Sequence, residues 1–128
     1  MGSEVDDSVM EGEDTYTLFQ RGRAHMQAGD NAQATVALEK AKRREPDKAS
    51  IREALGVAYL RLYRYSEAAA EFEHILSSAP ANHYAHYCLG RCLTRMGEDG
   101  LAAGHYKMAL WLRPEVDYYR EAVDRLSA

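Results

Sequence analysis

Several features are scarce or missing in this 128-residue chain, and each scarcity excludes a class of protein. Two cysteines are too few for a disulfide scaffold, which favours a reducing compartment, so we expect a cytoplasmic location. No apolar run approaches the ~18–20 residues of a membrane-spanning helix, and we expect no membrane insertion. Basic residues number 16 against 20 acidic ones. The chain therefore lacks the strongly basic face of a nucleic-acid-binding protein, and we expect no nucleic acid as a partner.

Acidic residues are concentrated at the start of the chain. Residues 1–14 contain six of them and no lysine or arginine, whereas residues 15–128 have a formal charge of +2, from 16 basic and 14 acidic residues. A segment so acidic has little to bury, and we predict that residues 1–14 are disordered. The six are Glu4, Asp6, Asp7, Glu11, Glu13 and Asp14.

Proline is scarce as well, and its spacing is regular. The three prolines, Pro46, Pro80 and Pro114, are equally spaced along the chain, which indicates a repeat architecture. We place the repeats at 15–48, 49–82 and 83–116, within a repeat region of 15–114 that a capping helix at 115–127 follows. Shifting the chain by the proline interval aligns Gly22, Gly56 and Gly90; Ala34, Ala68 and Ala102; Leu38, Phe72 and Tyr106; and Ala41, Ile75 and Ala109.

Each repeat is predicted to form two helices, because apolar residues recur three and four positions apart. Gly29 and Gly97 mark turns between paired helices, since glycine permits the left-handed backbone that ends a helix. Tyr63 stands at the corresponding turn of the second repeat and implies backbone strain there. The recurrent mid-helix glycine costs about 1 kcal/mol relative to alanine. We therefore predict that the paired helix approaches closely there, across the repeated alanines.

The capping helix has one apolar and one charged face. A solenoid needs a polar outer face at its ends, and the charged face would supply it. We expect the apolar face to cover the third repeat, including Leu110 and extending to Trp111. The apolar residues are Val116, Tyr119, Val123 and Leu126.

With these columns aligned, the chain resembles the tetratricopeptide repeat family over residues 15–116. That family's 34-residue pattern has glycine at position 8, alanine at 20, an aromatic at 24, alanine at 27 and proline at 32. The large aromatic often found at position 4 is replaced here by Leu18, Arg52 and His86. The resemblance implies an all-α, right-handed α-solenoid of three helix-turn-helix motifs with a capping helix. Its first helices would line a concave groove.

The resemblance also implies which repeat positions face that groove. In this sequence they are rich in tyrosine and arginine, the residues that dominate binding hot spots. We predict a non-catalytic adaptor that binds a partner peptide with acidic and apolar residues. The acidic residues 1–14 could compete for the groove, although a solubilising leader is the simpler interpretation. The predicted groove residues are Tyr16, Phe19, Arg23, Met26, Val57, Arg61, Tyr84, Tyr87, Cys88, Arg91, Arg95 and Tyr118.

One known ligand of the family is not expected. Relatives that bind the Glu-Glu-Val-Asp tail of heat-shock chaperones clamp its carboxylates with lysine, asparagine and arginine at five positions. We predict that this chain does not bind the chaperone tail by that clamp. The five positions hold Phe19, Arg23, Ala54, Tyr84 and Cys88.

Neither metal binding nor catalysis is predicted, and no cofactor is expected. Cys88 and Cys92 are four residues apart on one predicted helix, with His83 and His86 on another side, so the four do not converge as metal ligands. No phosphate-binding glycine-rich loop or nucleophile elbow is present. A basic run between residues 40 and 52 is interpreted as cations that complement a helix end.

Two other functions remain open. The uncovered face of the first repeat, with Leu18, Phe19 and Arg21, could stack on a second copy and form a homodimer. The other alternative is a holdase similar to the bacterial secretion chaperones that are built of three such repeats, although no residue of this sequence singles it out.

Overall fold

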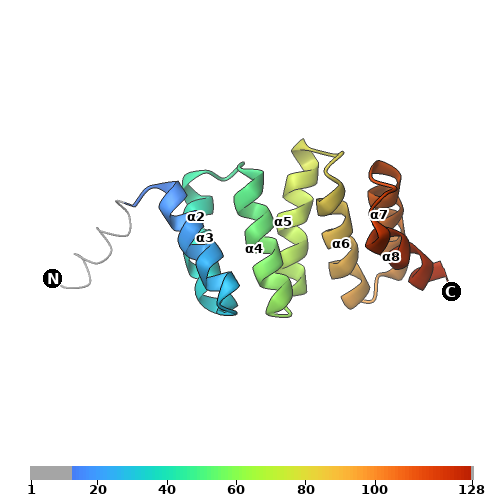
Figure 1. Ribbon diagram of the computed structural model, residues 1–128, viewed down its shortest axis with the longest axis horizontal. Coiled ribbons are helices and arrows are strands. Elements are labelled where there is room, and N and C mark those ends of the chain that lie inside the picture. Colours follow the sequence, from blue (N-terminus) through green and yellow to red (C-terminus); the bar gives the residue numbers. More distant parts are fainter. Residues whose placement is uncertain (1–12, 128) are drawn as a thin grey trace.

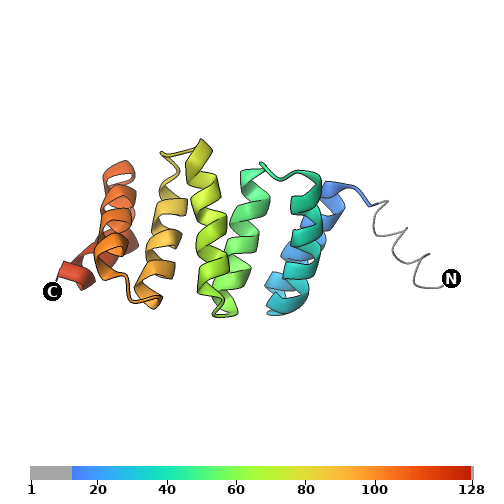
Figure 2. The ribbon, with the colours of Figure 1, turned by 180° about the vertical axis from the view of Figure 1, so that it is seen from behind.

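The protein is described by a computed structural model over residues 13–127. This part of the chain contains only α-helices, which form two layers (Figures 1 and 2). One layer consists of α2 (Thr15–Gln27), α4 (Ala49–Arg61), α6 (His83–Arg95) and α8 (Asp117–Ser127). The other consists of α3 (Asn31–Arg44), α5 (Tyr65–Ser78) and α7 (Asp99–Leu112). The helices of the first layer begin at the same regular interval as the prolines, so the chain is an all-α helical-repeat solenoid.

Short polar side chains cap the first helix of two repeats. The carboxylate of Asp14 accepts a hydrogen bond of 2.7 Å from the backbone N–H of Thr17, and Asn82 accepts one of 3.0 Å from Ala85. Glu13 forms an ion pair of 2.7 Å with Arg21 on α2. The predicted disorder of residues 1–14 is therefore wrong for its last two residues, and residues 1–12 lie outside the described part of the chain.

The turns between paired helices have the predicted left-handed backbone. Gly29 has a φ of 79° and Gly97 a φ of 81°. Tyr63 adopts the same conformation, with a φ of 61°, although its Cβ makes that conformation unfavourable. The second repeat thus stores backbone strain where the other two have glycine.

The recurrent glycines permit close helix packing, but not against the residues we predicted. A Cβ at Gly56 would lie 2.6 Å from the Phe72 ring, and the same separation holds between Gly90 and Tyr106. The side chain at repeat position 24, rather than the alanine at position 20, fills the space above each glycine. The alanines such as Ala68 are fully buried elsewhere in the same core.

The last helix, α8, packs on the third repeat through Tyr119 and Ala122, which are buried. Tyr119 also joins it to α6, because its hydroxyl lies 2.7 Å from Nδ1 of His83. The prediction that this helix covers Trp111 is wrong. The indole lies on the outer side of α7 and is 78% exposed.

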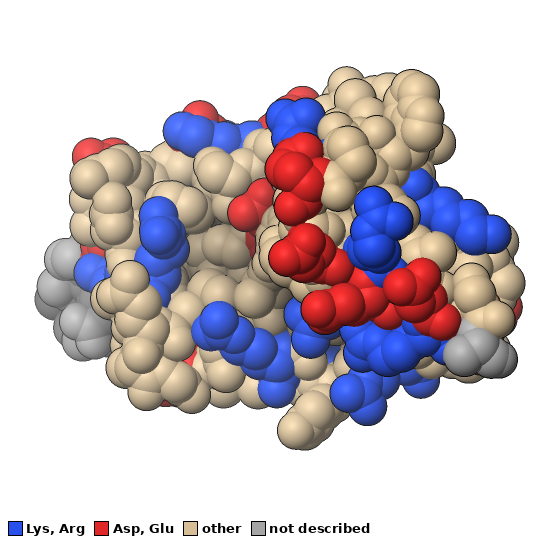
Figure 3. Space-filling model, turned by 45° about the vertical axis from the view of Figure 1, so that its right-hand side comes forward, with Lys and Arg blue, Asp and Glu red and all other residues tan. Residues whose placement is uncertain are grey.

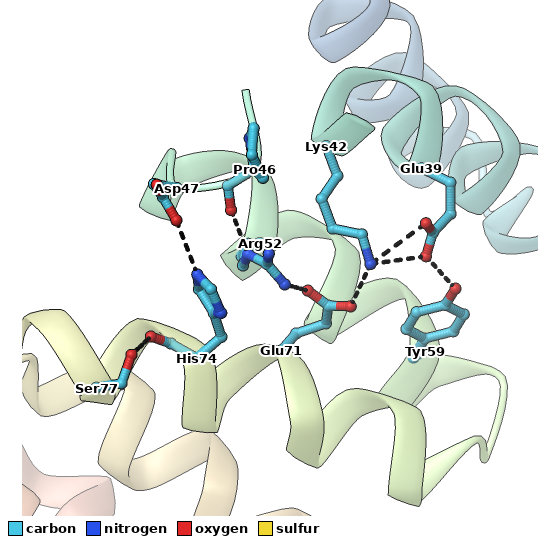
Figure 4. A network of polar contacts seen from close by, with 9 residues as sticks. All are labelled: Glu39, Lys42, Pro46, Asp47, Arg52, Tyr59, Glu71, His74 and Ser77. Carbon is cyan, nitrogen blue, oxygen red and sulfur yellow. Dashed lines mark hydrogen bonds and ion pairs between the residues drawn. The ribbon is translucent and has the colours of Figure 1, made fainter. Parts of the chain in front are cut away.

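A buried ion network links α3, α4 and α5 (Figure 4). Only 5% of Glu71 is exposed, and its two carboxylate oxygens lie 2.9 Å from Nζ of Lys42 and 3.0 Å from Nη1 of Arg52. Arg52 also donates a 2.6 Å hydrogen bond to the carbonyl of Pro46. Two cations of the basic run thus hold neighbouring repeats together.

Candidate functional site

Two adjoining hollows lie across the face formed by α2, α4 and α6. The larger, which we call the carboxy-terminal hollow, has a volume of about 1120 Å³, and the amino-terminal hollow has one of about 510 Å³. Val57, Arg61 and Tyr84 line both, so the two hollows form one groove. Figure 3 views this face obliquely and shows a depression with basic side chains on its left and lower edges and a row of acidic side chains along its right edge.

Nine of the twelve predicted groove residues line one or both hollows. α2 provides those of the first repeat, α4 those of the second and α6 those of the third, because each first helix turns the same repeat positions toward this face. The nine are Phe19, Arg23, Met26, Val57, Arg61, Tyr84, Tyr87, Arg91 and Arg95.

The other three predicted residues lie elsewhere. Tyr16 is 69% exposed, outside the lining of either hollow. Tyr118 also lies outside the lining, but its ring packs edge-on against Tyr87 at 5.0 Å and so supports the wall of the groove. Cys88 is completely buried in the core cluster that also contains Leu89 of α6 and Ala122 of α8. The prediction that Cys88 lies in the groove is therefore wrong, and burial raises the pKa of its thiol to about 12.

Three tyrosines of the larger hollow were not predicted as groove residues, namely Tyr63, Tyr65 and Tyr106. Tyr106 comes from the second layer and reaches the groove over Gly90, which has no side chain to block it. Its hydroxyl lies 3.3 Å from Oγ1 of Thr94, at the floor of the hollow. A tyrosine in the column where the other repeats have leucine and phenylalanine was the available signal.

The tyrosines of the groove pack against one another. The ring of Tyr87 lies 5.7 Å from that of Tyr106 and 5.1 Å from that of Tyr119. Burial is the main cause of a raised pKa at Tyr87, so its hydroxyl stays protonated at neutral pH. These contacts fix the aromatic wall before any ligand arrives, which reduces the entropy lost on binding.

Five arginines line the groove, and they differ in their partners. Arg23 stacks over the Phe19 ring at 5.7 Å, and Arg91 over the Tyr87 ring at 6.0 Å. Arg61 donates a 3.3 Å hydrogen bond to the carbonyl of Met26. Within residues 13–127, no carboxylate forms an ion pair with any of the five arginines. They are Arg23, Arg61, Arg91, Arg95 and Arg125.

Glu53 on α4 is the single acidic residue of the groove lining. It lies in the amino-terminal hollow, and its pKa is raised because burial penalises the charged carboxylate. The groove therefore has a strong positive excess with one embedded negative group.

Metal-ligating side chains do not cluster in the described part of the chain. No three histidine, cysteine or acidic side chains there are placed to hold a metal ion. Nε2 of His86 instead lies 2.7 Å from the carbonyl oxygen of Pro80, and its Nδ1 lies 3.0 Å from Nδ1 of His105.

Among residues 13–127, none of the helices has both the length and the apolar character that a membrane span requires.

Solved structures with the same fold include several repeat domains. The first TPR of Spaghetti (RPAP3), bound to the HSP90 peptide SRMEEVD, has a TM-score of 0.85 and 17% identity over 89% of this chain and 90% of that chain. The Arabidopsis OM64 TPR domain has a TM-score of 0.84 and 19% identity, over 88% and 93%. MamA from Desulfovibrio magneticus RS-1 has a TM-score of 0.86 and 24% identity, over 91% of this chain but only 66% of that chain. At these identities the likeness concerns the fold alone.

The family of the chain can be assigned from its sequence. No curated protein sequence matches this chain. The family model of the tetratricopeptide repeat, however, matches residues 19–83 and again residues 64–127. The two matches together extend over most of the chain and over every helix from α3 to α8. The chain therefore belongs to the tetratricopeptide repeat family.

Proposed function

We propose that this protein is a non-catalytic interaction adaptor that holds an acidic, partly apolar peptide of a partner protein in its groove. The observation that carries the proposal is the composition of the lining, in which five arginines and five tyrosines accompany one carboxylate. Arginine binds carboxylates through paired hydrogen bonds, and tyrosine offers broad contact area at low entropic cost. The fold itself supports protein binding in general.

The chaperone-tail clamp is excluded from this proposal. Phe19, Arg23, Ala54 and Tyr84 occupy four of its five positions and line the amino-terminal hollow. The fifth position is the buried Cys88. An apolar residue of the ligand would fit between Phe19 and Ala54, where a clamp would require lysine and asparagine. We therefore propose a ligand different from the HSP90 peptide bound by the structural neighbour.

Selection from a random library of displayed 12-residue peptides would test the function. We expect the immobilised protein to enrich peptides rich in aspartate, glutamate and large apolar residues. The double variant Tyr87→Ala, Arg91→Ala should lose this enrichment, because it removes the central ring and one unpaired cation of the groove. Binding of the selected peptides should weaken as salt increases.

A matched variant controls for the loss of one tyrosine and one arginine. Tyr16→Ala with Arg43→Ala makes the same chemical change at exposed residues outside both hollows. It should select the same peptides as the unaltered protein. Equal losses in both variants, or no enriched peptides at all, would contradict the proposed function.

Self-association is a second candidate, favoured by an apolar stripe on the outer side of α7. Leu101, Met108 and Trp111 are exposed there, and Gly104 between them has open space above it. In an antiparallel pair of α7 helices, Leu101 would face Trp111 of the second copy and Gly104 would face its Met108. At the positions equivalent to Leu101, Met108 and Trp111, the first two repeats have polar residues: Gln33, Lys40, Arg43, Glu67, His74 and Ser77.

The contact on α7 replaces the one suggested at the open end of the first repeat. Of the residues named for that end, Leu18 is completely buried and Arg21 is paired with Glu13, so neither is available for a contact with a second copy. Sedimentation at increasing protein concentration should show a dimer that the variant Trp111→Ser does not form. A monomer at all concentrations would exclude this candidate.

A further inference from the structure

Glu53 is out of place in a groove otherwise lined by cations. It stands on α4, in the amino-terminal hollow, among Phe19, Met26 and Tyr84. Among the described residues it has neither a hydrogen-bond donor nor an ion-pair partner. A half-buried carboxylate without a partner costs free energy, and a ligand that supplies one would recover it.

The arginines of the groove do not serve as that partner. Arg23 is stacked on Phe19, and Arg61 is held at the turn after α2 through the carbonyl of Met26 and, at 3.5 Å, the side chain of Asn31. Burial is the sole cause of the raised pKa of Glu53, and no nearby cation lowers it. The negative group is thus left available on the groove surface.

We propose that the groove contains a cation subsite at Glu53, so that the bound peptide carries a lysine or arginine as well as acidic residues. The inference rests on the proposed function and adds to it a second charge of the ligand. The ligand is therefore not simply acidic. Its cation binds in the amino-terminal hollow, beside the apolar surface of Phe19 and Met26, which also accommodates the aliphatic stem of a lysine or arginine.

The helix register gives the approximate spacing of the two charges. Glu53 is eight residues before Arg61 on α4, a separation of about 12 Å along the helix axis. Arg91 and Arg95 stand at repeat positions 9 and 13 of α6, level with Val57 and Arg61 rather than with Glu53. An extended peptide covers this distance in about three to four residues. The cation and the nearest acidic residue of the ligand should therefore be that far apart.

Complementary charge at two points also determines orientation. A uniformly acidic peptide could lie in a uniformly basic groove in either direction. The amino-terminal hollow has Glu53 beside Arg23 and Arg61, whereas the carboxy-terminal hollow has arginines and no carboxylate. The reversed peptide would place its cation among Arg91, Arg95 and Arg125, where like charges meet without a carboxylate to offset them. The carboxylate thus selects one direction of binding.

The library selection distinguishes this inference from the proposed function. The unaltered protein should enrich peptides that contain acidic residues and, three to four positions away, a lysine or arginine. Glu53→Gln keeps the size of the side chain and removes its charge, so this variant should retain the acidic enrichment and lose the basic one. Glu98→Gln makes the same change outside the groove and should select as the unaltered protein does.

Affinity measurements on one selected peptide complete the test. Replacing its cationic residue by norleucine should weaken binding to the unaltered protein about tenfold or more, the effect of a charged hydrogen bond, and leave binding to the Glu53→Gln variant nearly unchanged. Acidic peptides without a basic residue, or basic enrichment that persists in Glu53→Gln, would overturn the subsite and leave the proposed function standing. A selection without enriched peptides would overturn both.

Discussion

The ring of Phe72 on α5 occupies the space that a side chain at Gly56 on α4 would need. A Cβ added to Gly56 would lie 2.6 Å from the ring, closer than real Cβ contacts allow. Leu38 and Tyr106 bear the same relation to Gly22 and Gly90. In each repeat, a large side chain of the second helix therefore packs against a glycine of the first helix.

Replacing Gly56 with alanine should destabilise the protein. Overpacking of a core costs about 1–3 kcal/mol, and the better helix propensity of alanine returns only about 1 kcal/mol. Gly104→Ala is the matched control, because Gly104 also lies inside a helix but has nothing within 4 Å of an added Cβ. Urea unfolding should show a lower midpoint for Gly56→Ala and a higher one for Gly104→Ala. Equal shifts would contradict the packing role of Phe72.

The buried Glu71 should matter more for stability than an exposed ion pair does. Glu71→Ala would leave Arg52 without its carboxylate, at a cost of about 3 kcal/mol. Glu67→Ala breaks the exposed pair with Arg64, and we expect it to change the unfolding midpoint little. The loss at Glu71 should also persist at high salt, because a buried pair is poorly screened. Comparable effects of the two substitutions would contradict this ranking.

The strained turn at Tyr63 predicts a stabilising substitution. Its φ of 61° is accessible to glycine without a steric penalty, and its side chain is 76% exposed, so Tyr63→Gly should stabilise the protein by up to ~1 kcal/mol. Gly97→Ala makes the opposite change at the equivalent turn, because it places a Cβ on a residue with a positive φ, and it should destabilise the protein by about 1 kcal/mol. No neighbour lies within 4 Å of that Cβ, so the effect would come from the backbone conformation alone. Thermal unfolding of both variants measures the pair of effects. A lower melting temperature for Tyr63→Gly would show that the exposed ring contributes more than the strain costs.

The repeat columns predict the fold because they record local requirements that recur. Pro46 marks the end of a second helix, Gly97 a left-handed turn, and Gly56 a close helix contact. Each of these constraints acts within one helix pair, and a single repeat period therefore reveals them all. The helices α2, α4 and α6 begin at Thr15, Ala49 and His83, one repeat period apart.

The groove was less predictable because its lining depends on contacts between repeats and with the last helix. The register of the first helices predicts that Tyr87 and Arg91 face the groove, but it assigns Cys88 to the same face. Only the packed position of α8 shows that the thiol is covered. Tyr106 lies on the other layer, and its access to the groove follows from the missing side chain of Gly90. The tyrosine in that repeat column was a signal for Tyr106, but the cover over Cys88 depends on packing between helices that the repeat columns do not describe.

The contact between His86 and His105 predicts that stability falls in mild acid. Burial, and secondarily the charge of His86, lower the pKa of His105, while Glu73 opposes the shift. Because the folded histidine binds its proton less readily than the unfolded one, whose pKa is about 6.5, acid favours unfolding. The stabilisation should be complete above that pH and be lost as the pH falls below it. Burial and Arg113 lower the pKa of His83 as well, which acts in the same direction.

Urea unfolding at pH 7.5 and pH 5.5 would measure the contribution of His105 and His83 to the acid sensitivity. We expect a lower midpoint at pH 5.5 for the unaltered protein and a smaller decrease for His105→Asn, in which the group that resists protonation is absent. Part of the decrease should remain in that variant because His83 still titrates. The double variant His83→Asn, His105→Asn should lose most of it. An equal decrease in all three proteins would show that the acid sensitivity does not come from His83 and His105.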